Sequence, residues 1–218
     1  MPTNNAKLNN AVMVYVTTFD SDVEVGEVKP SVRNGQIQRC TDVVAKLQRY
    51  CVWKLLDYAL HDCYGGGVAD FDLYIDGNGK WNSHNGVEFS LSHSNNVVAV
   101  AVCNHFVGVD VEAVARFANH VDDGFAKRIL TDSEQLVLRD TPAELRAEAL
   151  AEMWTKKESI FKLQSRSSFR PKSFDTTKTP THFQFLTVNG EKYALSVARY
   201  IPSKIELVQP DWKDILQQ

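Results

Sequence analysis

The chain has 218 residues and a mass of 24.5 kDa, which fits one compact body or two small fused halves. Its hydrophobic fraction of 44% and charged fraction of 23% exclude a disordered or collagen-like chain. The net charge of −3 argues against bulk electrostatic binding of nucleic acid. No apolar run approaches the roughly 20 residues of a membrane span, and the polar start lacks the apolar core of a secretory signal. We therefore expect a cytoplasmic protein without nucleic-acid or membrane partners, and the length suggests a monomer.

The four cysteines, at positions 40, 51, 63 and 103, form no Cys-x-x-Cys pair and no zinc-ligand spacing with histidine. Their even number permits two disulfides. Because a chain of this length can build its own core, reduced thiols are the expectation.

Hydrophobic periodicity, turn residues and helix caps divide the chain into elements. Strands are expected over residues 11–19, 71–75, 87–92, 96–103, 106–112, 182–188, 191–199 and 205–208. Helices are expected over residues 41–62, after the capping box of Thr131 and Glu134, and from Thr141-Pro142 to about residue 164. The segments 21–36 and 165–180 are expected to be loops.

The periodic positions also predict which side chains are buried. Val12, Val14 and Val16 share one face of the first strand. The long first helix carries an apolar stripe at helical spacing, made of Val44, Leu47, Cys51, Leu55 and Tyr58.

Short links between strands predict two hairpins. Asn189-Gly190 is a strong hairpin signal, and Asn104-His105 predicts that strands 96–103 and 106–112 pair antiparallel. The resulting fold class is α+β with mostly antiparallel sheets. We expect two pseudo-symmetric α/β halves, 1–105 and 106–218, each with a long helix followed by paired strands.

The segment Gly108-Val-Asp-Val-Glu112 places two carboxylates on one face of a strand, because side chains two apart point the same way. Asp110 and Glu112 would repel each other unless a cation or a proton separates them, and Mg²⁺ prefers such oxygen ligands. A strand with a solvated acidic face is the alternative.

A second group lies on the last long helix, in Trp154-Thr-Lys-Lys-Glu-Ser-Ile-Phe-Lys162. Leu150, Trp154 and Phe161 form an apolar stripe, and Glu158 lies at its margin, where a carboxylate needs a partner. The alternative is an ordinary surface pair between Glu158 and Lys162.

A third group is Phe89-Ser-Leu-Ser-His-Ser94 at the end of a strand. The Ser92 hydroxyl, the His93 imidazole and free backbone N–H groups at such a bend suit a phosphate. The alternative is a turn that satisfies its own backbone. A Ser–His hydrolase is a poor alternative, because there is no nucleophile elbow.

Together these three motifs, in this order, resemble the 4′-phosphopantetheinyl transferases, and the length resembles the double-size Sfp-type branch. Arg128-Ile-Leu-Thr-Asp-Ser-Glu134 also resembles a family segment, and the likeness covers about half the chain. The resemblance implies the family fold. It also implies transfer of the phosphopantetheine arm from coenzyme A, the co-substrate, to a serine of an apo carrier protein of fatty-acid, polyketide or nonribosomal-peptide synthesis.

The resemblance implies roles for single residues. Asp110, Glu112 and Glu158 correspond to the Mg²⁺ carboxylates, with Glu158 also the candidate base. Lys162 corresponds to the lysine that meets the diphosphate. The remaining coenzyme A contacts that it implies are Ser92, His93, Lys80, Lys46 and Arg49.

Two departures from the family pattern stand out. Trp81 replaces the proline expected after Lys80, and the glycine-rich segment usual after Lys162 is absent. The residues there are basic, and Arg166, Arg170 and Lys172 either contribute to docking of an acidic carrier or form a solubilising loop. A catalytically impaired module that binds coenzyme A or the carrier, and a plain interaction domain, are the alternatives from other classes.

Overall fold

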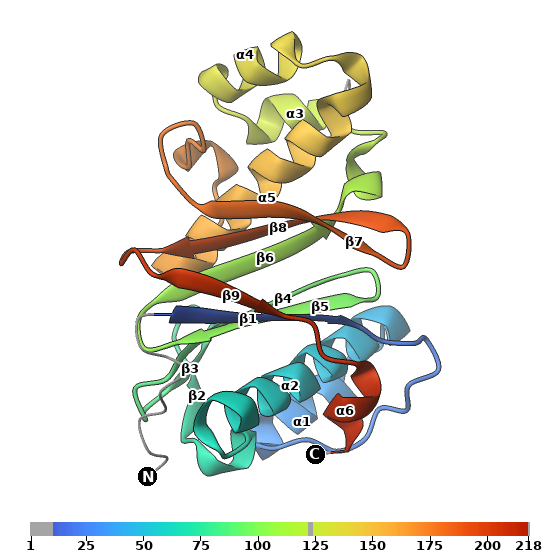
Figure 1. Ribbon diagram of the computed structural model, residues 1–218, viewed down its shortest axis with the longest axis vertical. Helices are drawn as coiled ribbons and strands as arrows, with labels where there is room; N and C mark the ends of the chain where they lie inside the picture. Colours follow the sequence, from blue (N-terminus) through green and yellow to red (C-terminus); the bar gives the residue numbers. More distant parts are fainter. Residues whose placement is uncertain (1–10, 122–123, 218) are drawn as a thin grey trace. The chain divides into compact units, whose positions relative to one another are not determined.

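The computed structural model describes residues 11–121 and 124–217, so the polar start of the chain lies outside the described residues. It confirms the α+β class with mostly antiparallel sheets (Figure 1). The chain divides into two compact units. The first takes the chain up to Val107 and again from Ile201, and the second is Gly108–Tyr200.

The first unit is built on a four-stranded sheet with the order β4-β5-β1-β9. Its strands are β4 (Glu88–Ser94), β5 (Val97–Cys103), β1 (Ala11–Thr18) and β9 (Lys204–Val208). β1 and β5 pair antiparallel, whereas β1 and β9 are parallel. Its other elements are α1 (Ser31–Gln38), α2 (Val43–Tyr64), β2 (Leu73–Ile75), β3 (Trp81–Ser83) and α6 (Trp212–Leu216).

Helix α2 packs against β5 and forms the main core of the first unit (Figure 1). Asp42 caps its start, and Gly65 ends it with a φ of +77°, which glycine adopts without strain. Of the predicted stripe, Leu47, Cys51 and Leu55 are buried. Val44 is 62% exposed, because it lies in the first turn of the helix, before the face that meets the sheet.

The predicted antiparallel hairpin of β5 with the following strand is wrong. β5 is already paired on both sides, with β4 and β1, so no free edge remains for β6 (Val107–Ala113). The tight hairpin of this region joins β4 to β5 through Asn95-Asn96 instead, and Asn95 has a φ of +51°, which asparagine tolerates.

Part of the expected loop 21–36 is helical, because α1 occupies Ser31–Gln38. This helix is polar, which hid it in the sequence, but Ile37 and Arg33 are buried and fix it to α2. Helix α6 and strand β3 were also not predicted, since both are too short to show a period.

The second unit contains a three-stranded sheet with the order β6-β8-β7. Strands β7 (His182–Val188) and β8 (Glu191–Arg199) form the predicted hairpin, and Asn189 and Gly190 both have positive φ. Helix α5 (Arg146–Gln164) packs along β8 (Figure 1). Two shorter helices precede it, α3 (Gly124–Ile129) and α4 (Asp132–Asp140), and Thr131 and Glu134 form the predicted capping box of α4.

The expected halves, 1–105 and 106–218, differ from the two units at the C-terminus. Residues 201–217 return to the first unit, because β9 pairs with β1 and α6 packs on α2. Each unit nevertheless has the expected layout of one long helix packed against a sheet.

The four cysteines are free, as expected. Within the described residues, no helix has the length and apolar character that crossing a membrane requires.

Candidate functional site

The two carboxylates of β6 are buried, although the strand carries them opposite its apolar face. Asp110 is 3% exposed and Glu112 8%, while Val109 and Val111 are fully buried. The solvated acidic face considered from the sequence is therefore wrong. Burial makes the charge of both carboxylates costly unless other groups compensate it.

Gly108 allows α5 to approach this strand closely. A Cβ on Gly108 would lie 1.9 Å from the Ser159 carbonyl oxygen and 2.6 Å from the Leu163 nitrogen, both backbone atoms of α5. Only glycine fits this contact. The close approach brings the end of α5 within reach of Asp110.

Lys162 of α5 forms an ion pair with Asp110, with 2.7 Å between Nζ and Oδ1. The surface pair between Lys162 and Glu158 is thus not the arrangement that forms. Lys162 keeps part of its side chain exposed, at 25%, while that of Asp110 is buried. The ammonium group can therefore meet both the buried carboxylate and a ligand from solvent.

Glu158 joins the same electrostatic group. Burial, and then repulsion from Asp110 and Glu112, raise its pKa to about 7, although Lys162 and Arg116 oppose the shift. Three carboxylates, Asp110, Glu112 and Glu158, and two cations, Lys162 and Arg116, thus act on one another in this region.

Trp154 and Arg116 are among the residues that hold the Glu112 carboxylate. The Trp154 indole donates from Nε1 to Glu112 Oε1 at 3.2 Å, and Arg116 forms an ion pair with Oε2. The Arg116 side chain is 54% exposed, so this pair weakens as salt rises.

We tested whether these residues suit a divalent cation. The donors are hard carboxylate oxygens, which Mg²⁺ prefers, and the pKa of Glu158 is raised by burial and then by the negative charges of Asp110 and Glu112. Over residues 11–121 and 124–217, however, no three histidine, cysteine, aspartate or glutamate side chains come together as a metal-binding group. The set fits Mg²⁺ in its chemistry, while Lys162 and Arg116 hold Asp110 and Glu112 in the observed conformation.

The phosphate candidates Ser92 and His93 lie at the end of β4, in the first unit. Ser92 is buried and His93 is exposed. The Gln48 amide of α2 donates to the Asn95 carbonyl at 2.8 Å, which ties α2 to the turn after these residues. Lys46 and Arg49 lie on the same helix, but at about 100° per residue Lys46 points away from Gln48, so the contact at this turn is made by Gln48.

Arg33 is a basic residue that the sequence argument missed, because it lies in the segment taken as a loop. Its side chain is 8% exposed and stacks 4.8 Å from the Trp53 ring. Nη2 donates to the Arg49 carbonyl at 2.9 Å, while the buried Nε has no hydrogen-bond partner. Burial, and then the charge of Arg49, lower the pKa of Arg33 to about 10. An anion bound near Arg33 and Arg49 would offset the repulsion between their positive charges.

Lys80 lies apart from this group. Burial lowers its pKa, and the charges of Glu88 and Asp76 oppose the shift. Glu88 begins β4 and His93 is near its end, a separation of about 17 Å at roughly 3.3 Å per residue. The structure therefore does not bring Lys80 to Ser92 and His93.

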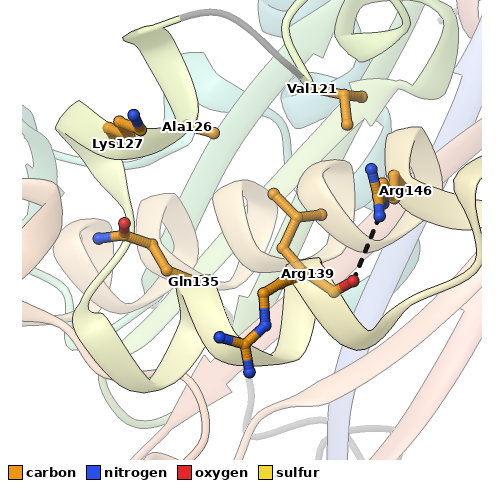
Figure 2. Close-up of a pocket in the computed structure, with 7 residues that line it drawn as sticks. Val121, Ala126, Lys127, Gln135, Arg139 and Arg146 are labelled. Atoms are coloured by element: carbon orange, nitrogen blue, oxygen red, sulfur yellow. Dashed lines mark hydrogen bonds between the residues drawn. The ribbon is translucent and has the colours of Figure 1, made fainter.

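A cavity of about 250 Å³ lies among α3, α4 and the start of α5 (Figure 2). Its lining is apolar and basic, and Arg146 is fixed by a bond from Nη2 to the Arg139 carbonyl at 3.2 Å. None of the predicted site residues lines it. The cavity is therefore separate from the carboxylates of β6.

Comparison with known proteins identifies the class. A model of the 4′-phosphopantetheinyl transferase superfamily matches residues 106–203. The matched segment contains Asp110, Glu112, Glu158 and Lys162. This segment, which is less than half of the chain, is similar to that superfamily, and the resemblance inferred from the sequence motifs is confirmed to that extent.

Two curated relatives carry the same class name. The chain is 28% identical to the 4′-phosphopantetheinyl transferase gsp of Aneurinibacillus migulanus over 108 residues, which is 50% of this chain and 38% of the relative. It is 28% identical to the 4′-phosphopantetheinyl transferase psf-1 of Bacillus pumilus over 114 residues, 51% and 47% of the two chains. The matches therefore span less than half the length of these relatives.

Proposed function

We propose that this chain transfers the 4′-phosphopantetheine arm of coenzyme A to a serine of an apo carrier protein. The observation that supports this most directly is the group of charges in the second unit. Asp110 pairs with Lys162 at 2.7 Å, and Asp110 and Glu112 act electrostatically on Glu158. All four residues lie in the segment that matches the superfamily.

The reaction is a displacement at phosphorus. The serine oxygen attacks the phosphorus nearer the pantetheine, and the bond from that phosphorus to the bridging oxygen breaks. Adenosine 3′,5′-bisphosphate leaves with the bridging oxygen and its charge. Glu158, directly or through one water, is the proposed acceptor of the serine proton.

The carboxylates Asp110, Glu112 and Glu158 would hold Mg²⁺. When bound, this ion supplies positive charge that stabilises the diphosphate oxygens. Lys162 adds a second positive charge, already oriented by Asp110, and such preorganised charge is effective because it does not have to rearrange during the reaction.

The basic residues of the first unit are proposed to bind a phosphate of coenzyme A. Lys46, Arg49, Ser92 and His93 are the proposed contacts, and they are supported by the bond from Gln48 of α2 to the turn that follows His93. Arg33 strengthens this group, because its buried Nε needs an acceptor. Lys80, which lies apart from this group, is proposed to contact another part of the co-substrate.

The proposed partner is a carrier protein of fatty-acid, polyketide or nonribosomal-peptide synthesis. The proposed form of this protein is a cytoplasmic monomer. Carriers are acidic, and Arg166, Arg170 and Lys172 are all exposed on the loop after α5. Charge reversal of Arg170 and Lys172 together should slow transfer at low salt, and less so at high salt.

The test is incubation of purified protein with coenzyme A, Mg²⁺ and a panel of apo carriers, followed by mass spectrometry. A mass gain of one phosphopantetheine per carrier supports the proposal, and EDTA should prevent it until Mg²⁺ is restored. Binding of coenzyme A without any gain would favour the impaired module. Failure to bind coenzyme A would favour a plain interaction domain.

A further inference from the structure

The loop that follows α5 places an aromatic ring against the catalytic face of this helix. Phe169 contacts Trp154 edge-on, with 5.4 Å between ring centroids, and Phe161 at 5.0 Å. Its ring also stacks on Phe174 at 6.0 Å. This loop replaces the glycine-rich segment that the family usually has after Lys162. The contacts of Phe169 therefore come from residues in which this chain departs from the family pattern.

The two rings that Phe169 contacts on α5 flank Glu158. Trp154 lies four residues before Glu158 and Phe161 three residues after it, so all three lie on one helix face. A ring in contact with both Trp154 and Phe161 spans the turn that carries Glu158. Phe169 therefore covers this face beside the carboxylate group.

Trp154 connects this cover to Glu112. Its indole N–H, which can only donate, bonds to Glu112 Oε1 at 3.2 Å. Phe125 contacts the same indole at 5.5 Å and Phe169 at 5.4 Å. The orientation of the bond to Glu112 therefore depends on the rings that hold Trp154.

Buried contacts fix the loop that presents Phe169. Lys157, whose side chain is fully buried, donates to the carbonyls of Pro171 and Phe174. Glu134 accepts from the backbone N–H of Thr176 at 2.8 Å and from its hydroxyl at 2.7 Å. Phe169 is thus held by a loop whose far end is bonded to α4 and α5.

We infer that Phe169 is a positioning residue, which holds Trp154 so that its indole N–H orients Glu112 for the cation. The reaction it serves rests on the proposed function. The successive contacts from Phe169 to Trp154 and from Trp154 to Glu112 are observed directly in the structure. Partners that orient a metal ligand typically contribute 10–100-fold in metal affinity or activity.

The experiment is a double-mutant cycle on Phe169→Ala and Trp154→Phe, with Mg²⁺ titrated by calorimetry in the presence and absence of coenzyme A. Each single variant should bind Mg²⁺ about 10-fold more weakly than the wild type, and the double variant no more weakly than either one. Phe169→Leu, which keeps apolar bulk against Trp154, should restore most of the affinity. Phe185→Ala, which removes a partly exposed ring on β7, is the matched control and should bind as the wild type does.

A second readout reports on Trp154 directly. The emission of Trp154, taken as the difference between each protein and its Trp154→Phe counterpart, should shift in Phe169→Ala and in Glu112→Gln but not in Phe185→Ala. Mg²⁺ affinity within twofold of the wild type in Phe169→Ala, or additive losses in the double variant, would overturn the inference. Wild-type protein that binds no Mg²⁺ would overturn it together with the metal role, whereas Mg²⁺ binding without transfer of the arm would overturn only the proposed function.

Discussion

At the scale of the residue, Glu158 combines partial burial with repulsion from two other carboxylates. This arrangement is costly for the fold and useful for a cation or for proton transfer, as is typical of functional sites. Removal of the charge should therefore lower activity without lowering stability.

We expect Glu158→Gln to lower the rate of arm transfer by about 10²–10³, the usual cost of one preorganised electrostatic group. Its melting temperature in metal-free buffer should not fall, because the substitution removes a repelled charge. Transfer assays and thermal melts of the purified variant check both points. Glu148→Gln on the same helix, which removes the partner of Lys192, should transfer normally.

Gly108 is the second residue on which the site depends. A methyl group there would overlap backbone atoms of α5, which cannot rotate away as a side chain can. We expect Gly108→Ala to destabilise the second unit by about 1–3 kcal/mol, measured by urea unfolding. Gly124→Ala is the control, because its new Cβ would meet only Arg128 Nη1, at 3.5 Å. Equal stability of the two variants would contradict this account of the contact.

At the scale of the element, α4, α5 and the loop after α5 are joined by one buried ion pair. Lys157 Nζ lies 2.7 Å from Glu134 Oε2, and neither side chain is exposed to solvent. Burial alone would raise the pKa of Glu134, but hydrogen bonds from Lys157, Thr176 and Thr131 outweigh it and lower the pKa. Burial lowers the pKa of Lys157 as well, against the attraction of Glu134.

This pair predicts how stability depends on pH. A carboxyl whose pKa is lower in the folded state stabilises the fold above its unfolded pKa of 4.5. That contribution is lost as pH falls below 4.5 and through the lower folded value. Urea midpoints measured from pH 7 down to pH 2 should show wild type and Glu134→Gln converging in acid. A difference in urea midpoint between the two proteins that stays the same from pH 7 to pH 2 would contradict the lowered pKa of Glu134.

Removal of the cation leaves a buried carboxylate without its partner. Lys157→Met should destabilise the second unit by about 3–5 kcal/mol at neutral pH. Lys156→Met, at the adjacent and partly exposed position, is the matched control, and its loss should be much smaller. Protease sensitivity of the loop 165–176 should rise only in Lys157→Met, since Lys157 holds the carbonyls of Pro171 and Phe174.

At the scale of the whole molecule, the chain returns to its first unit at the end. Trp212 and Ile215 of α6 are 8% and 1% exposed in the core formed with α2, and Phe19 contacts the Trp212 ring at 6.1 Å. The first unit is therefore completed by residues almost two hundred positions from its first strand.

We expect Trp212→Ala to destabilise the first unit by about 3–5 kcal/mol, because it empties a large buried site. Hydrogen exchange should then quicken in β1 and β5 more than in β7 and β8, which belong to the other unit. Leu216→Ala, at a position 49% exposed, should leave exchange unchanged. Uniform quickening in both units would indicate that they unfold together.

The sequence by itself determined the elements with a clear period and the residues with a clear chemistry. The long helices α2 and α5, the β7–β8 hairpin and the capping box of α4 depend on local backbone preferences and on side-chain spacing. The position of Asp110 and Glu112 on the same face of one strand also depends only on that spacing. Local interactions of this kind are readable along the chain.

Only the tertiary structure decided which elements and charges meet. β6 joins β8 instead of β5, because β5 has no free edge, and β9 returns to β1. Asp110 and Glu112 are buried, Lys162 pairs with Asp110 instead of its helical neighbour Glu158, and Arg33 comes to Arg49. These outcomes depend on contacts distant in sequence, whose free energies come from burial and charge compensation in the folded chain.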